Sequence, residues 1–190
     1  TDNSCRLLSV SHDHASYSAY QAFDYDADGN MLNDEQGQRL IYDTQGRLLR
    51  VDAAEGGHTV CRYRYDAHNH LVSTQAGTQT ETLRFYEGNR LRLAVHKGIS
   101  THLLTVNEQP IGQQQSGDEN KTLVLLTDAS HTVVGESLQN QLLTASYTAY
   151  GERSTEQALQ RLVAFNGEVV DEASGRYLLG KGYRAYNQHL

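Results

Sequence analysis

One short pattern recurs along this chain, and it restricts the possible folds more than any other feature. Its copies begin with tyrosines at positions 25, 42, 65 and 86, at intervals of 17, 23 and 21 residues. In repeats of this length each unit is one supersecondary element that buries little surface alone, so neighbouring units must stack. The chain is therefore expected to be a repeat protein.

Each copy predicts a strand, a tight turn and a second strand. The tyrosine ring covers a pleated sheet surface, and the following carboxylate can accept backbone N–H groups within a turn. Gly or Asn then supplies a position where a positive φ costs little. The residues that carry the pattern are Tyr25, Asp26 and Gly29; Tyr42, Asp43, Gly46, Arg47 and Leu48; Tyr65, Asp66 and Leu71; and, in a weaker fourth copy, Tyr86 and Gly88.

The composition favours a sheet that is wet on at least one face. Hydrophobic residues make up 38% of the 190, the mean hydropathy is −0.61, and Tyr outnumbers Phe by 12 to 3 without any Trp. Such amphipathic aromatic residues suit half-buried sheet surfaces. The predicted class is all-β, an array of antiparallel hairpins with at most one short helix.

Several function classes are disfavoured by the bulk properties. The net charge of −7 and the lack of a basic run argue against nucleic acid or anionic membranes as partners. No apolar run is long enough to span a bilayer, and no signal peptide opens the chain. Cys5 and Cys61 do not suggest a disulfide framework.

Three polar clusters are tempting as sites, but we interpret each one as turn or loop chemistry. His12-Asp13-His14 and His68-Asn69-His70 have two imidazoles each and no identifiable third ligand, so no metal site is expected. Asp128-Ala129-Ser130-His131 lacks a nucleophile-elbow sequence, so no catalytic triad is expected. No cofactor is predicted.

The repeated Tyr-Asp-x-x-Gly-Arg-Leu pattern resembles the YD-repeat, or RHS-repeat, family. A later block resembles the family's RHS-associated core, and similarity is greatest to the C component of bacterial toxin complexes and to RHS effectors. The residues of this block are Tyr150 and Gly151; Phe165, Asn166, Gly167 and Glu168; Gly175 and Tyr177; and Gly182, Tyr183, Arg184 and Tyr186.

Three regions are expected: a hairpin array over 1–106, a loop or linker over 107–121 and the associated core over 122–190. Within the core we predict a strand over 122–127, a short helix near 155–161, and a hairpin of 162–170 with 176–186. The array's interleaved arginines are expected to line its solvated face and to pair with acidic residues; they are Arg62, Arg64, Arg84, Arg90 and Arg92.

The resemblance implies a non-catalytic part of a spiralling β-sheet shell with a plug-like core. Such shells enclose a C-terminal toxin segment, so the implied partners are that segment and the rest of the shell, either upstream repeats or a companion B-type component. A secreted or delivered toxin component is implied. The family cleaves itself at aspartates beyond its core, and we expect this chain to stop before them, with Asp171 no substitute. The alternative is a surface module that binds carbohydrate or another protein.

Overall fold

The computed structural model describes residues 6–11, 13, 20–117, 120–139, 141–153, 162–171, 176–179 and 184–186. Within these residues the chain forms three antiparallel sheets and one short 3-10 helix, η1 (Phe165–Gly167). The predicted all-β class is therefore confirmed.

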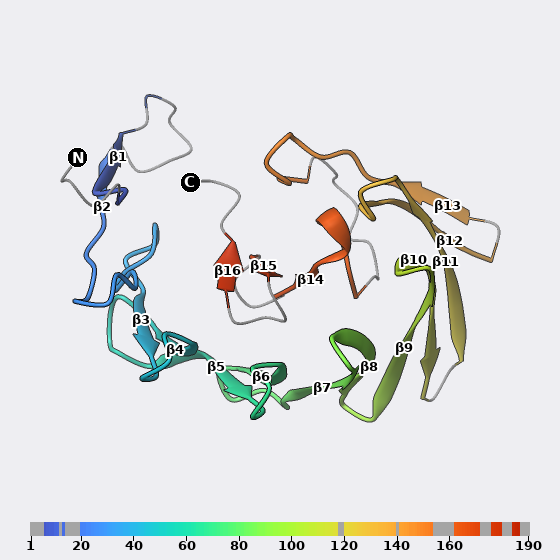
Figure 1. Cartoon of the computed structure of the whole chain (residues 1–190), viewed down its shortest axis with the longest axis horizontal. Coiled ribbons are helices and arrows are strands. Elements are labelled where there is room, and N and C mark those ends of the chain that lie inside the picture. The colour runs from blue at the N-terminus through green and yellow to red at the C-terminus, as the bar shows by residue number, and fades with distance from the viewer. Residues whose placement is uncertain are drawn as a thin grey trace.

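The largest sheet contains eleven strands, and each pairs with its neighbours in sequence. It curves into an arc that is open on one side (Figure 1). Its strands are β3 (Arg39–Tyr42), β4 (Leu48–Asp52), β5 (Thr59–Tyr65), β6 (Leu71–Ala76), β7 (Thr82–Glu87), β8 (Arg90–His96), β9 (Ile99–Val106), β10 (Gln109–Ser116), β11 (Lys121–Thr127), β12 (Val133–Leu138) and β13 (Gln141–Thr144).

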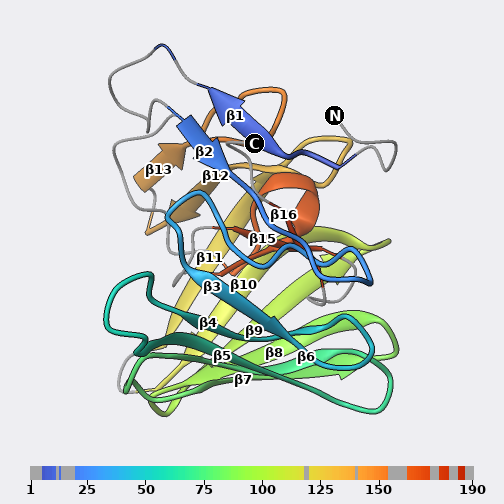
Figure 2. The ribbon, with the colours of Figure 1, turned by 90° about the vertical axis from the view of Figure 1, so that its left-hand side faces the viewer.

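Two small sheets complete the fold. At the start of the chain β1 (Ser9–Ser11) pairs with β2 (Tyr20–Ala22). Near its end β14 (Val169–Val170), β15 (Tyr177–Leu179) and β16 (Arg184–Tyr186) form a three-stranded sheet. Figure 1 shows this last sheet and η1 inside the arc, and Figure 2 shows β15 and β16 over strands β3 to β9. The predicted pairing of 162–170 with 176–186 is confirmed.

The two faces of the main sheet differ in burial because side chains alternate along each strand. In β11, Leu123 and Leu125 are buried whereas Val124 and Leu126 are exposed. In β5, Cys61 and Tyr63 are buried whereas Arg62 and Arg64 are exposed. The buried side chains belong to the concave face, because that face carries the inner strands.

The inner strands contribute directly to the hydrophobic core of the sheet. Leu178 of β15 joins a buried cluster made by Leu40, Leu48, Val51, Cys61, Tyr63 and Leu71. A second cluster contains Leu103, Leu125, Val133 and Val163. Val169 of β14 packs against both clusters. We call residues 163–171 and 176–179 the inner segment. It is held on the concave face by apolar burial, the main favourable term in folding.

The prediction of a loop or linker over 107–121 is wrong for most of that range. Residues 109–116 form β10, which pairs with β9 on one side and β11 on the other. The glutamine-rich composition was misleading, because Gln113 is fully buried and accepts a hydrogen bond of 2.8 Å from the backbone N–H of Leu162. The division into three regions stays a prediction, and the helix expected near 155–161 lies outside the described residues.

Candidate functional site: the concave face and its inner segment

Among the described residues, seven turns share one geometry. In each, the residue that opens the turn pairs with the residue six positions later. The pairs are Tyr25 with Met31, Asn33 with Arg39, Tyr42 with Leu48, Tyr65 with Leu71, Thr127 with Val133, Tyr147 with Arg153, and Val163 with Val169.

The fifth residue of every one of these turns has a positive φ. The values range from 65° at Asn69 to 90° at Gly29. The fifth residues are Gly29, Gly37, Gly46, Asn69, His131, Gly151 and Gly167. Glycine and asparagine tolerate this left-handed region best, which explains the recurring Gly or Asn of the sequence pattern.

An aspartate closes five of the seven turns. Its Oδ1 accepts the backbone N–H of the residue four positions later, at distances from 2.8 Å in the Asp26 turn to 3.0 Å in the Asp43 turn. Asp34, Asp66 and Asp128 do the same. Partial burial raises the pKa of Asp43, but the N–H groups of Arg47 and Gln45 and the Arg47 guanidinium outweigh it and hold that pKa below its ordinary value.

Three tyrosine hydroxyls donate to the carbonyl of the residue that closes the preceding turn. The hydroxyl of Tyr65 donates to the carbonyl of Leu48 at 3.0 Å, and that of Tyr86 donates to the carbonyl of Leu71 at 3.2 Å. Tyr147 repeats the contact with Val133 at 3.0 Å. Burial raises the pKa of Tyr86 to about 12, so this phenol remains a donor at neutral pH.

Two buried polar contacts anchor the inner segment to the first half of the sheet. The hydroxyl of Tyr63 donates to Oδ2 of Asp171 at 2.8 Å. Arg176 donates to Oδ2 of Asp34 at 2.8 Å and contacts the carboxylate of Glu35 at 3.0 Å. All four of Tyr63, Asp171, Arg176 and Asp34 are buried. Buried charges that are paired in this way are costly to separate.

A second set of contacts anchors the inner segment to the other end of the sheet. The Phe165 ring lies 5.8 Å from the Tyr147 ring and 5.9 Å from the Tyr177 ring. The Tyr177 hydroxyl donates to the carbonyl of Gly151 at 2.9 Å. The backbone N–H of Val133 donates to the carbonyl of Ala164 at 3.0 Å. Residues 163–171 and 176–179 therefore contact both ends of the arc.

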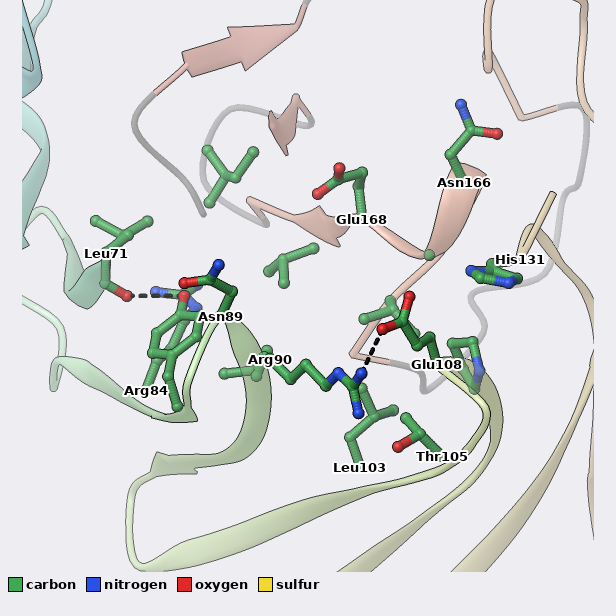
Figure 3. Close-up of a pocket in the computed structure, with 17 residues that line it drawn as sticks. Leu71, Arg84, Asn89, Arg90, Leu103, Thr105, Glu108, His131, Asn166 and Glu168 are labelled. Carbon is green, nitrogen blue, oxygen red and sulfur yellow. Dashed lines mark hydrogen bonds and ion pairs between the residues drawn. The ribbon is translucent and has the colours of Figure 1, made fainter. Parts of the chain in front are cut away.

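A cavity of about 350 Å³ remains between the sheet and the inner segment (Figure 3). It is lined from the sheet by Leu71, Arg84, Arg90, Leu103 and Glu108, and from the inner segment by Val163, Asn166 and Glu168, among others. Arg90 and Glu108 form an ion pair on its wall. Burial raises the pKa of Glu168. The cavity therefore offers both apolar and charged groups.

Arg84 contradicts the expectation that the interleaved arginines lie on the solvated face. It is only 6% exposed, and its Nη1 donates to Thr74 Oγ1 at 3.0 Å while its Nε has no partner among the described residues. Burial lowers the pKa of its guanidinium. The expectation holds for Arg64 and Arg92, which pair with Glu81 and Glu87 at 3.6 and 2.7 Å.

The structure brings some residues of the expected core block together and leaves others apart. Gly151, Phe165 and Tyr177 form one cluster, and the backbone N–H of Asn166 donates to Thr132 Oγ1 at 3.1 Å. Tyr150 is 70% exposed and stands apart from them. Arg184 and Tyr186 belong to β16, whereas Gly175, Gly182 and Tyr183 lie outside the described residues.

Sequence reasoning missed four of the seven turns as members of the repeat. Those that open at Asn33, Thr127, Tyr147 and Val163 lack the Tyr-Asp pair. Asp34-x-x-Gly37 and Asp128-x-x-His131 nevertheless keep the carboxylate three residues before the positive φ. That spacing is the signal that could have found two of them. The Asp128 carboxylate accepts the N–H groups of Ser130 and Thr132, which is the expected turn chemistry.

A curved antiparallel sheet built from such repeated turns, with C-terminal strands on its concave face, defines an all-β repeat fold. Residues 42–80 match the family model of the RHS repeat. Among curated proteins no sequence matches it. Within the described residues, no helix is long and apolar enough to cross a membrane.

Solved toxin-complex structures share this fold. The crystal structure of TcdB2-TccC3 aligns with a TM-score of 0.55 at 18% identity, and that of TcdB2-TccC3-Cdc42 with 0.62 at 19%. A Photorhabdus luminescens Tc holotoxin pore carrying a TccC3 mutation aligns with 0.57 at 17%. Each alignment covers 86% of this chain and 9% of the solved chain. At these identities the likeness establishes the fold alone.

Proposed function

We propose that this chain is part of a shell that encloses a toxin segment and helps to deliver it. One observation carries the proposal. The inner segment lies on the concave face of the sheet and is anchored at both ends of the arc, through Asp34 and Tyr63 at one end and Gly151 at the other. Such an arrangement suits a container whose interior is partly filled by its own C-terminal part.

The proposal names two partners, the toxin segment that follows the core and the rest of the shell. β13 has one neighbour in the main sheet, and Leu142 on it is 57% exposed. An unpaired sheet edge with an exposed apolar side chain favours pairing with a further strand. Upstream repeats or a companion component would supply that strand. The whole assembly would be a secreted or delivered toxin component.

In this proposal the chain contributes no catalytic group, and self-cleavage depends on aspartates that follow the core. The natural full-length gene product that contains this segment should therefore be cut a short distance beyond residue 190. On a denaturing gel it should give two pieces, and the smaller should elute with the larger before denaturation. A single uncut chain of full mass would contradict the proposal and favour a surface-binding role.

Asp171 provides the sharpest control for this assignment, since it is the buried aspartate of the inner segment. Asp171→Asn in the full-length protein should leave the cut intact, because the carboxylate is a buried acceptor for Tyr63 and has a structural role. Tyr63→Phe removes the same hydrogen bond and controls for loss of folding. Loss of cleavage in Asp171→Asn but not in Tyr63→Phe would make Asp171 a catalytic residue.

A further inference from the structure

The turn that opens at Tyr65 differs chemically from every other turn of its kind. Its aspartate, Asp66, is followed by His68 and His70 at the second and fourth positions after it. The ligating atoms of these three side chains all lie within 4.8 Å of one another. We infer that Asp66, His68 and His70 form a binding site for a first-row divalent transition metal such as Zn²⁺.

The shared backbone of the turn gathers the three side chains. The N–H groups of His68 and His70 both donate to Asp66 Oδ1, at 2.8 and 2.9 Å. Oδ1 is thereby occupied, and the carboxylate is fixed with its Oδ2 on the side of the imidazoles. Oδ2 lies 2.9 Å from Nδ1 of His70. Fixing a carboxylate through its second oxygen is how outer contacts orient metal ligands.

The His70 ring is held in a ligating orientation from two sides. It stacks on the Tyr86 ring with centroids 4.7 Å apart. Its Nε2 lies 3.4 Å from Oδ1 of Asn89. In the tautomer whose Nε2–H donates a hydrogen bond to that amide oxygen, the neutral ring presents an Nδ1 lone pair to the Asp66 carboxylate. A divalent cation placed between the two resolves that repulsion, and an imidazole with its other N–H bonded to an oxygen is the usual form of a metal ligand.

The remaining geometry requires only a small movement. Ligands around tetrahedral zinc lie about 3.3 Å apart, as follows from bonds of about 2.0 to 2.1 Å. The Asp66–His70 distance is already close to this value, and the exposed His68 ring can turn toward them. Two imidazoles and one carboxylate favour Zn²⁺, Ni²⁺ or Cu²⁺ over the oxygen-seeking Ca²⁺ and Mg²⁺. Water would complete the coordination.

The other aspartate turns have different side chains at the position that His70 occupies in this turn. In the preceding unit Arg47 occupies the place of His70: its Nε contacts Asp43 Oδ2 at 2.7 Å, and its guanidinium lies 5.1 Å from the Tyr65 ring centre. In the first unit the Nδ2 of Asn30 contacts Asp26 Oδ2 at 2.8 Å. In these three turns the carboxylate Oδ2 contacts the side chain four residues later, and among the five aspartate turns only the Asp66 turn has a histidine at that position.

Metal content of the untagged protein tests the inference. After dialysis against Zn²⁺ and then metal-free buffer, elemental analysis should find one more equivalent of zinc in the wild type than in either His68→Ala or His70→Arg. The affinity measured by titration should fall at least about tenfold in both variants. His70→Arg recreates the Arg47 arrangement, so its thermal unfolding in metal-free buffer should resemble that of the wild type.

His58→Ala is the matched control, because His58 is exposed on another loop and should leave binding unchanged. Zinc content that is equal in the wild type, His68→Ala and His70→Arg would overturn the inference and place any bound metal on other histidines. Absence of zinc from the wild type would overturn it as well. Neither result bears on the proposed shell function, which the cleavage experiment tests.

Discussion

The hydroxyl of Tyr63 and the carboxylate of Asp171 form a buried hydrogen bond of 2.8 Å across 108 residues of sequence. Tyr63 lies in β5, the third strand from one edge of the main sheet, and Asp171 follows the inner strand β14. Burial, followed by the Asp171 charge, raises the pKa of Tyr63, so the phenol is protonated and can donate at neutral pH. This contact joins the sheet to the segment inside it.

Tyr63→Phe should destabilise the protein by about 1–3 kcal/mol, because it leaves a buried carboxylate without one of its donors. The change removes a single oxygen and keeps the ring, so packing is preserved. Urea denaturation should show a lower midpoint with an unchanged slope. Tyr150→Phe, at a 70% exposed position, is the control and should have no effect. Equal stability of the two variants would show that Tyr63 does not anchor the inner segment.

Gly151→Ala should destabilise more than Gly57→Ala, although both glycines have a positive φ. Both variants place a residue with a Cβ at a positive φ, which costs about 1–2 kcal/mol in each. A Cβ at Gly57 meets nothing within 4 Å, whereas one at Gly151 lies 2.8 Å from Cδ1 of Phe165. Phe165 packs near Tyr147 and Tyr177 and has little room to move away. The difference between the two urea midpoints measures this overlap, and equal midpoints would contradict it.

Asp43→Asn should cost about 1 kcal/mol at pH 7, and the difference from the wild type should shrink below about pH 4. The pKa of Asp43 is lower in the folded protein than in the unfolded chain. Its contribution is therefore present above the unfolded pKa and is lost as the pH falls through the folded one. Denaturation at several pH values checks this, with the exposed Asp28→Asn as control. A constant difference across that range would exclude the charge as the cause.

Glu168→Gln should raise the free energy of unfolding at pH 7, whereas Asp43→Asn lowers it. Burial raises the pKa of this carboxyl, so its charge opposes folding at neutral pH and the penalty disappears once both states are protonated. A gain on the order of 1 kcal/mol is expected at pH 7 and none at pH 3. Thermal unfolding at the two pH values measures it. Glu55→Gln, on an exposed loop, should give no gain at either pH.

The repeat could be predicted where the sequence states both of its physical requirements. At Tyr25, Tyr42 and Tyr65 a carboxylate precedes a Gly or Asn at the correct spacing, and all three form the expected turn. Asn33 and Thr127 open the same turn without the tyrosine, because the aspartate and the positive φ suffice for the backbone. The turn that opens at Val163 has neither the tyrosine nor the aspartate, and only Gly167 marks its positive φ.

The interior of the sheet was harder to predict because burial there depends on distant partners. Gln113 and Arg84 have side chains that favour solvent, yet both are buried, one against Leu162 and the other against Thr74. No local pattern records that residues about fifty positions away will cover Gln113. The paired imidazoles of His68 and His70 were visible, but only the fold shows that Asp66 lies beside them.

The eleven strands of the main sheet pair with their neighbours in sequence, so each hairpin can form while the ribosome is still adding residues. The contact of Asp34 with Arg176 spans 142 residues and must wait until nearly the whole chain has emerged. During synthesis the main sheet can therefore form first, and the inner strands can pack on its concave face only afterwards. During that interval the apolar side chains of the concave face are not yet covered by the inner strands, and a partly folded chain with such a surface is prone to aggregate.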